Sequence, residues 1–253
     1  MQIDTQRFYR CEASCFDSIA CREDRPWGWL YHDLENTDSW DSNHACVTDL
    51  TADMDGITAQ IEAFYNDLGI VPRVYSAYLP NDEQIVVPAL LERGFRFKRD
   101  SVRRMMVFTG QPQPLRADLT YKRLHRVDDG VRNIVLSDED GLVFGSWSLS
   151  VLEKSVRLDT FCLLAAYYEG RAVAMASMEL LDGFSRVDNV ETLKDCRGRG
   201  FGTAVMNFLI NEHTKLSANT LYLYAVNDTA QRMYRRCGFE QIDSPAFWSA
   251  WKG

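Results

Sequence analysis

The residues between Val190 and Thr203 could form a site for an anionic ligand. Their order is Val-Glu-Thr-Leu-Lys-Asp-Cys-Arg-Gly-Arg-Gly-Phe-Gly-Thr. The apolar pattern predicts a strand before this loop and an amphipathic helix after Gly200. The start of a helix offers backbone N–H groups without partners and a positive dipole end, and glycines let a ligand approach the backbone closely. With Arg197 and Arg199 nearby, these features suit a pyrophosphate.

Two other phosphate-binding motifs do not fit this loop. The sequence has no Gly-Lys-Ser/Thr, which the loop of nucleotide-hydrolysing enzymes requires. A dinucleotide fingerprint would need a glycine at Thr203 and an opening βαβ unit, and the loop comes late in the chain. A glycine-rich turn without any ligand is the remaining alternative for the loop alone.

A second motif follows between Asn227 and Phe239. Its pattern is Asn-x-x-Ala-x-x-x-Tyr-x-x-x-Gly-Phe, and it comes after the Arg-x-x-Gly-x-Gly of residues 197–202. The two motifs in this order, with a helix and a strand expected between them, resemble the GNAT superfamily of N-acetyltransferases. The resemblance covers roughly residues 117–250 and is best over 188–239.

The resemblance implies an acetyl-CoA site in a cleft between two parallel strands, which end near Thr192 and Val226. The pantetheine would pair with the main chain around Val190 to Leu193, which includes Thr192, and Asn227 would hold the cofactor or the loop. Tyr234 would protonate the departing CoA thiolate. The pyrophosphate would lie on the N–H groups of the loop, whose residues are Arg197, Gly198, Arg199, Gly200, Gly202 and Thr203.

Attack by an amine also requires a base, because a primary amine is protonated at neutral pH. Glu191, on the strand beside the expected cofactor, is the first candidate. Glu179, Asp188 and a chain of water molecules are alternatives. Side chains alternate along a strand, and the sequence does not fix which of these carboxylates faces the cleft. A phenol such as Tyr234, with a pKa of about 10, can donate to a thiolate at neutral pH.

The elements that must position these residues alternate between strands and helices. We expect a mixed α/β sheet built from the following strands and helices: strands over 119–124, 161–168, 172–181, 186–192 and 221–226, with helices over 146–157, 201–216 and 228–237. An internal repeat at an offset of 144 places Gly238-Phe239 on Gly94-Phe95. The chain is therefore expected to hold two tandem GNAT-like domains.

The segment 109–118 contains two prolines and a glycine and is expected to be a linker. It would separate a domain of residues 1–110 from a catalytic domain of residues 111–253. At the offset of 144, Arg197 and Arg199 become Asp53 and Asp55, and Tyr234 becomes Leu90. Carboxylates repel a pyrophosphate, so the first domain is expected to be a degenerate copy without a cofactor site.

Composition limits the remaining possibilities. The chain has 253 residues and a net charge of −8, which gives no sign of a nucleic-acid partner. It shows no apolar run long enough for a membrane span and no secretory signal, so we expect a cytoplasmic protein with seven free cysteines and no metal. The expected activity is transfer of an acetyl group from acetyl-CoA to an amine. A sensor that binds acetyl-CoA without turnover, and a transferase with another acyl donor, are alternatives.

Overall fold

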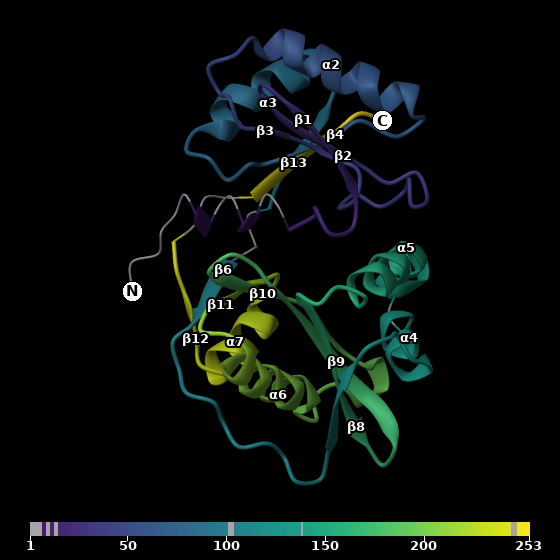
Figure 1. Ribbon diagram of the computed structural model, residues 1–253, viewed down its shortest axis with the longest axis vertical. Coiled ribbons are helices and arrows are strands. Elements are labelled where there is room, and N and C mark those ends of the chain that lie inside the picture. Colours follow the sequence, from purple (N-terminus) through teal and green to yellow (C-terminus); the bar gives the residue numbers. More distant parts are fainter. Residues whose placement is uncertain (1–6, 9–10, 13–14, 101–103, 138, 244–246) are drawn as a thin grey trace. The chain divides into compact units, whose positions relative to one another are not determined.

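The computed structural model describes residues 7–8, 11–12, 15–100, 104–137, 139–243 and 247–253, with the side chains of 139–144 excepted. The chain divides into two compact units (Figure 1). Unit 1 contains Met1–Ser101 together with Pro245–Gly253, and unit 2 contains Val102–Ser244. Each unit is a mixed sheet covered by helices, as the α/β prediction requires.

Unit 1 is built on a six-stranded sheet with the order β1-β2-β3-β4-β13-β5. Its elements in chain order are β1 (Cys21–Arg25), β2 (Gly28–His32), β3 (Ala45–Val47), α2 (Met54–Asp67), β4 (Arg73–Tyr75), α3 (Asp82–Glu92), β5 (Arg96–Asp100) and β13 (Phe247–Trp251). Strands β3 and β4 are parallel, and the other pairs are antiparallel. Helices α2 and α3 pack on one face through a core that includes Ile61, Leu90 and Trp248.

Unit 2 has a seven-stranded sheet with the order β12-β6-β11-β10-β9-β8-β7. Its elements are β6 (Arg104–Phe108), β7 (Thr120–Leu124), α4 (Asp129–Val135), α5 (Glu139–Ser155), β8 (Phe161–Tyr168), β9 (Arg171–Leu180), β10 (Phe184–Thr192), a 3-10 turn η1 (Lys194–Cys196), α6 (Phe201–Leu216), β11 (Thr220–Ala225), α7 (Asp228–Arg236) and β12 (Phe239–Gln241). Helices α6 and α7 lie on one face of the sheet, and α4 and α5 lie on the other (Figure 1). Each strand and helix that the sequence predicted in this region is confirmed, with ends shifted by a few residues and α5 starting earlier than residue 146.

Each half of the chain contributes one strand to the sheet of the other half. Strand β6 follows β5 in the chain but pairs with β11 and β12 of unit 2. Strand β13, at the end of the chain, pairs with β4 and β5 of unit 1. The units therefore differ from the predicted ranges 1–110 and 111–253, because β6 and β13 each pair on both sides with strands that are distant in the chain. Residues 109–119 still connect two strands without regular structure of their own.

The repeat extends along most of both units, but its offset varies. Helices α2 and α6 begin at residues 54 and 201, which are 147 apart, and β4 and β11 begin at 73 and 220, also 147 apart. Gly94 and Gly238 keep the offset of 144, and the exchanged strands begin at 104 and 247, which are 143 apart. The exchanged strands are thus equivalent members of the two repeats.

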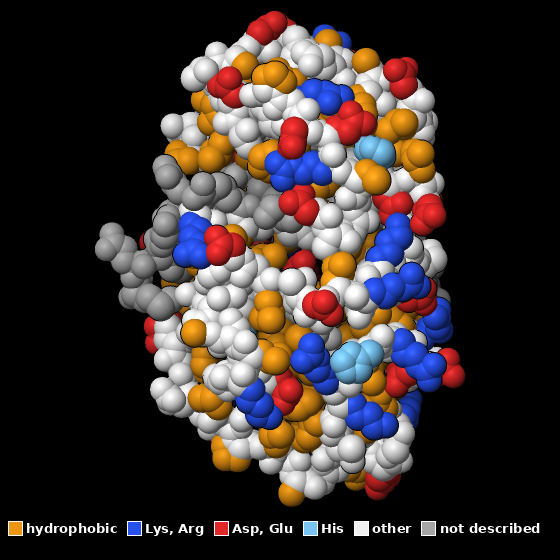
Figure 2. Space-filling model, viewed as in Figure 1, with side chains coloured by type: hydrophobic (Ala, Val, Ile, Leu, Met, Phe, Trp, Pro, Cys, Tyr) orange, Lys and Arg blue, Asp and Glu red, His pale blue; other side chains and the backbone are white. Residues whose placement is uncertain are grey.

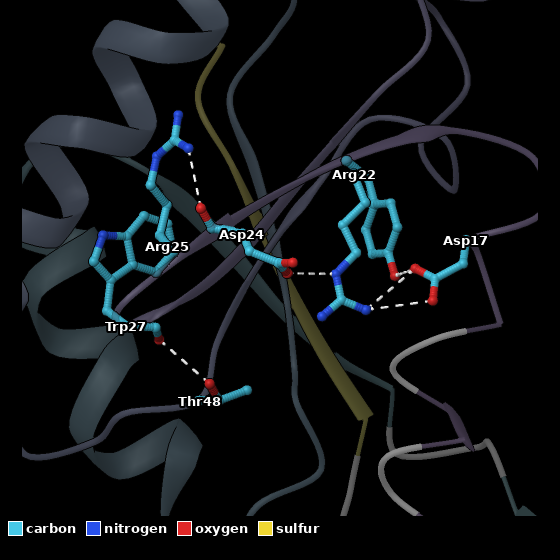
Figure 3. Close-up of polar contacts among 7 residues, drawn as sticks. Asp17, Arg22, Asp24, Arg25, Trp27 and Thr48 are labelled. Carbon is cyan, nitrogen blue, oxygen red and sulfur yellow. Dashed lines mark hydrogen bonds and ion pairs between the residues drawn. The ribbon is translucent and has the colours of Figure 1, made fainter.

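Polar contacts connect charged side chains on the surface of unit 1. In Figure 3, Arg22 lies between Asp17 and Asp24, and its Nε donates to Asp24 at 2.7 Å. Pairs as exposed as these contribute little to stability. On the face shown in Figure 2, acidic and basic side chains are intermixed over both units, so the net charge of −8 is not gathered there. No helix among the described residues is long and apolar enough to cross a lipid bilayer.

Candidate active site

Strands β10 and β11 separate along their length. They pair in parallel register only at three positions, from Phe184 opposite Thr220 to Arg186 opposite Tyr222. Beyond these pairs, β10 continues to Thr192 on the side of β9, while β11 continues on the side of β6. Over the described residues the register of β10 with β11 stops at Arg186, and two parallel strands that separate in this way suit an extended ligand between them.

A β-bulge interrupts β10 where the strands separate. Asp188 pairs with Ser177 and Glu191 with Met175, so two residues of β10 lie opposite one residue of β9. Asn189 takes the left-handed conformation, with φ of 51°. Its side-chain amide donates to Ser177 Oγ at 2.9 Å, and its backbone N–H donates to Asp188 Oδ1 at 2.9 Å. These bonds hold the bulge in one conformation.

The bulge sets the direction of the side chains that follow it. Thr192 Oγ1 lies 3.0 Å from the point where a Cβ on Gly202 would sit, so Thr192 faces helix α6. Because neighbouring side chains point to opposite faces, Glu191 points toward the face that carries α4 and α5. Its side chain is partly exposed. The structure thus gives the direction of the Glu191 side chain, which the sequence did not fix.

The loop between η1 and α6 presents a row of backbone donors. Gly198 and Gly200 have φ of 76° and 79°, a conformation that costs a residue with a Cβ about 1 kcal/mol or more. The first hydrogen bond of α6 runs from Ala204 N–H to Gly200 O at 3.0 Å. In the described part of the chain, the N–H groups from Gly198 to Thr203 have no acceptor, and the first turn of α6 has no acidic residue. An anion fits such a site.

The arginines of the loop are both held by neighbouring groups. Arg197 Nε donates to the carbonyl of Thr192 at 3.2 Å, so this side chain connects the strand end to the loop. The Arg199 guanidinium lies over the rings of Tyr168 and Phe201, at 5.1 and 4.9 Å from their centroids. Both side chains keep their positive charge near the donors of the loop.

Asn227 begins helix α7. Its side-chain oxygen accepts a hydrogen bond from Ala230 N–H at 2.8 Å, which is the usual arrangement of an N-cap residue. This contact positions α7 directly after β11, and it brings Tyr234 two turns further along the helix.

Tyr234 lies almost fully buried, with 6% of its surface exposed. Burial raises the pKa of Tyr234 well above its usual range, and the charges of Asp188 and Cys237 add to this increase. Asp188 itself forms an ion pair with Arg186 at 3.2 Å. The phenol therefore keeps its proton at neutral pH.

Sequence reasoning missed Arg116, which lies in the predicted linker. Its Nη1 donates to the carbonyl of Arg199 at 2.8 Å, so a residue 83 positions away contacts the loop. No spacing or motif around residue 116 signals this contact, because it depends on the path of the segment between β6 and β7.

In unit 1, the start of α2 is acidic. Asp53 is its N-cap residue, and Asp55 lies in its first turn. Aligned by helix starts, Asp53 replaces Gly200 and Asp55 replaces Gly202, which corrects the predicted pairing with Arg197 and Arg199. The Asp53 carboxylate lies 2.6 Å from where a Cβ on Gly56 would sit, over the helix start.

Comparisons with known proteins agree with this geometry. Residues 131–239 match the family "Acetyltransferase (GNAT) family". No curated protein matches the chain. A GCN5-related N-acetyltransferase from Kribbella flavida has the same fold with a TM-score of 0.65 and 15% identity, and the match covers 100% of this chain and 96% of that one. A tandem GNAT protein from the clavulanic acid biosynthesis pathway gives a TM-score of 0.54 and 13% identity over 78% of this chain and 69% of that one.

A third structure, a GCN5-related N-acetyltransferase from Sphaerobacter thermophilus, gives a TM-score of 0.55 and 14% identity over 89% of this chain and 76% of that one. At these identities the structures show the fold. The family match falls entirely inside unit 2, which is the unit with the separated strands, the bulge and the loop of backbone donors. Unit 2 of this tandem chain is a domain of the GNAT acetyltransferase family.

Proposed function

We propose that the protein is an N-acetyltransferase that transfers the acetyl group of acetyl-CoA to an amine in a ternary complex. The observation that carries this proposal is the coincidence, in one unit, of the separated strands β10 and β11 with the donor loop of residues 198–203. An extended pantetheine suits the first feature, and a pyrophosphate suits the second. The acceptor is an amine on a small molecule or a peptide.

The chain's residues then have distinct tasks. The loop residues Arg197 to Thr203 bind the pyrophosphate, while the main chain of Val190 and Thr192 pairs with the pantetheine. Backbone N–H groups near Val190 stabilise the negative charge on the acetyl oxygen. Asn227 keeps α7 in place. The thioester supplies the acetyl group when acetyl-CoA is bound.

Proton transfer completes the reaction. As the amine nitrogen forms its bond to the acetyl carbon, the bond from that carbon to sulfur breaks, and Tyr234 donates its proton to the sulfur. The amine loses a proton to a base, for which we propose Glu191, directly or through water. The raised pKa keeps Tyr234 protonated before each transfer, and it also makes the phenol a weaker acid, so the transfer depends on close contact with the sulfur.

We also propose that unit 1 does not bind the cofactor. Two carboxylates, Asp53 and Asp55, lie at the start of α2, where unit 2 has glycines. At the position of Tyr234, unit 1 has Leu90, which is fully buried and has no proton to give. One molecule of acetyl-CoA per chain is therefore expected.

The test combines binding with turnover. Calorimetry measures the affinity and stoichiometry of acetyl-CoA, and a thiol-release assay with a panel of amines measures transfer. Saturable binding of one molecule per chain, with CoA release that depends on the amine, supports the proposal. Binding without release by any amine favours the sensor. Absence of binding by the full chain contradicts both functions and leaves a donor other than acetyl-CoA.

A further inference from the structure

We propose that Arg116, in the segment between β6 and β7, is a positioning residue for the anion-binding loop. This inference rests on the proposed function, because the loop's task there is to hold the pyrophosphate of acetyl-CoA. Arg116 Nη1 donates to the carbonyl oxygen of Arg199 at 2.8 Å. The same nitrogen lies 3.5 Å from where a Cβ on Gly200 would sit. Arg116 therefore contacts the loop at the peptide bond between Arg199 and the left-handed Gly200.

The geometry of the peptide bond makes this contact directional. In a trans peptide the carbonyl oxygen and the following N–H point in opposite directions. The bond from Arg116 to the Arg199 carbonyl consequently turns the Gly200 N–H away from Arg116. It fixes the orientation of a donor that the proposed function assigns to the pyrophosphate. It also implies that Arg116 acts on the loop and not on the same phosphate.

Arg116 is itself held in place from three sides. Its Nε and Nη2 donate to the two carboxylate oxygens of Asp118, at 3.1 and 2.7 Å. Its guanidinium lies 5.1 Å from the ring centroid of Phe201, the first residue of α6. Its backbone N–H donates to the hydroxyl of Tyr121 at 3.2 Å. A fork-shaped pair of this kind fixes the plane of the guanidinium, which a lysine ammonium could not do.

The paired carboxylate also explains how two arginines can lie so close together. Arg116 and Arg199 both lie over the ring of Phe201, at 5.1 and 4.9 Å. Asp118 neutralises Arg116, and Arg116 in turn lowers the pKa of the Asp118 carboxyl through its hydrogen bond. Over the described ranges Arg199 forms no ion pair of this kind, so its positive charge remains available beside the loop. The predicted linker is in this way a part of the site.

The experiment compares Arg116→Gln and Arg116→Lys with wild type and with Arg132→Gln. Arg132 is a matched control, since it forms a similarly exposed ion pair with Glu153 in the same unit, at 2.6 Å. For each protein, calorimetry gives the Kd of acetyl-CoA and of dephospho-CoA, and turnover gives KM and kcat. Hydrogen exchange without ligand reports the first bonded amides of α6, residues 204–206, because Ala204 N–H donates to the carbonyl of Gly200 in the same loop.

Loss of one charge-assisted hydrogen bond predicts that Arg116→Gln raises the Kd and KM of acetyl-CoA about tenfold. We expect kcat to change less than about twofold, the amides of residues 204–206 to exchange faster, and Arg116→Lys to recover only part of the affinity. The Kd of dephospho-CoA should rise by the same factor as the Kd of acetyl-CoA. Arg132→Gln should equal wild type in all readings.

Three results would overturn the inference. An Arg116→Gln variant with the Kd of wild type would show that the loop needs no such contact. A loss that vanishes with dephospho-CoA would make Arg116 a direct ligand of the 3′-phosphate. Unchanged exchange of the amides of residues 204–206 in the protein without ligand would contradict the positioning role. Failure of the wild type to bind acetyl-CoA would instead contradict the proposed function, and the exchange measurement would still decide the role of Arg116.

Discussion

The indole nitrogen of Trp248 donates to Asp82 Oδ1 at 2.9 Å, although 166 positions separate the two residues. Asp82 lies in the first turn of α3, and its other oxygen accepts a hydrogen bond from Ser76 at 2.8 Å. Trp248 lies on the exchanged strand β13 and is 1% exposed. The core of unit 1 is thus completed by a residue near the end of the chain.

Replacement of Trp248 by alanine should therefore destabilise unit 1. The change removes a buried indole and leaves the Asp82 carboxylate without one donor, and we expect a loss of about 3–5 kcal/mol. Hydrogen exchange of the full chain is the measurement. Amides of β3 and β4 should exchange faster, while those of β8 and β9 keep their protection. If the amides of β8 and β9 exchanged faster and those of β3 and β4 did not change, β13 would not belong to the sheet of unit 1.

The N-cap residue of α2 is Asp53, whereas that of α6 is Gly200. A substitution at Gly200 can therefore introduce the charge of unit 1 into unit 2. Gly200→Asp gives unit 2 the N-cap residue of unit 1, and Gly200→Asn has nearly the same shape without the charge. Asparagine tolerates the left-handed conformation, so its effect reports strain alone. We expect Gly200→Asp to weaken acetyl-CoA binding about tenfold more than Gly200→Asn, because a carboxylate repels the pyrophosphate.

Salt dependence provides the control for this pair. The difference between the two variants should shrink in 1 M salt, where charges are screened within about 3 Å. Equal affinities at low salt would show that the anion does not lie at the start of α6.

Tyr234→Phe tests the proton donor. Loss of a general acid should lower kcat about 100-fold or more, while the Kd of acetyl-CoA stays near that of wild type. The pKa of Tyr234 is raised, so the phenol stays protonated through neutral and mildly alkaline pH. The ratio of wild-type to variant kcat should therefore be constant between about pH 6 and pH 9. A ratio that falls across this range, or a kcat within twofold of wild type, would exclude the role.

Burial lowers the pKa of His44 from 6.5 to about 3. The ring is fully buried in unit 1 and stacks on Tyr75 with centroids 4.2 Å apart. Between these two pH values the unfolded chain binds a proton that the folded chain does not. Stability should then fall as the pH falls from about 6.5 toward 3, by up to about 1.4 kcal/mol per pH unit.

His44→Phe should remove this contribution, since phenylalanine keeps the ring but cannot be protonated. Urea denaturation at several pH values between 4 and 8 measures the free energy of unfolding of both proteins. The variant should lose less stability in acid than wild type, with the two curves running parallel above about pH 7. Parallel curves over the whole range would show that His44 is protonated equally in the folded and unfolded chain.

The strands and helices of unit 2 follow from local patterns, and this explains why they could be predicted. Runs such as Phe161–Tyr168 and Phe201–Leu216 have the periods of a buried strand and an amphipathic helix, and the short motifs around Gly200 and Tyr234 indicate the family. These features depend on residues close together in the chain, so the sequence by itself determined the fold class, the tandem repeat and the location of the candidate site.

Tertiary structure decided the features that depend on distant partners. The exchange of β6 and β13 places each strand between two strands of the other half's sheet. The bulge of β10 fixes the direction of Glu191, and the path of a segment without regular structure brings Arg116 to the loop. Hydrogen bonds across a sheet or between a loop and a side chain join residues by their position in space, and spacing along the chain carries no record of them.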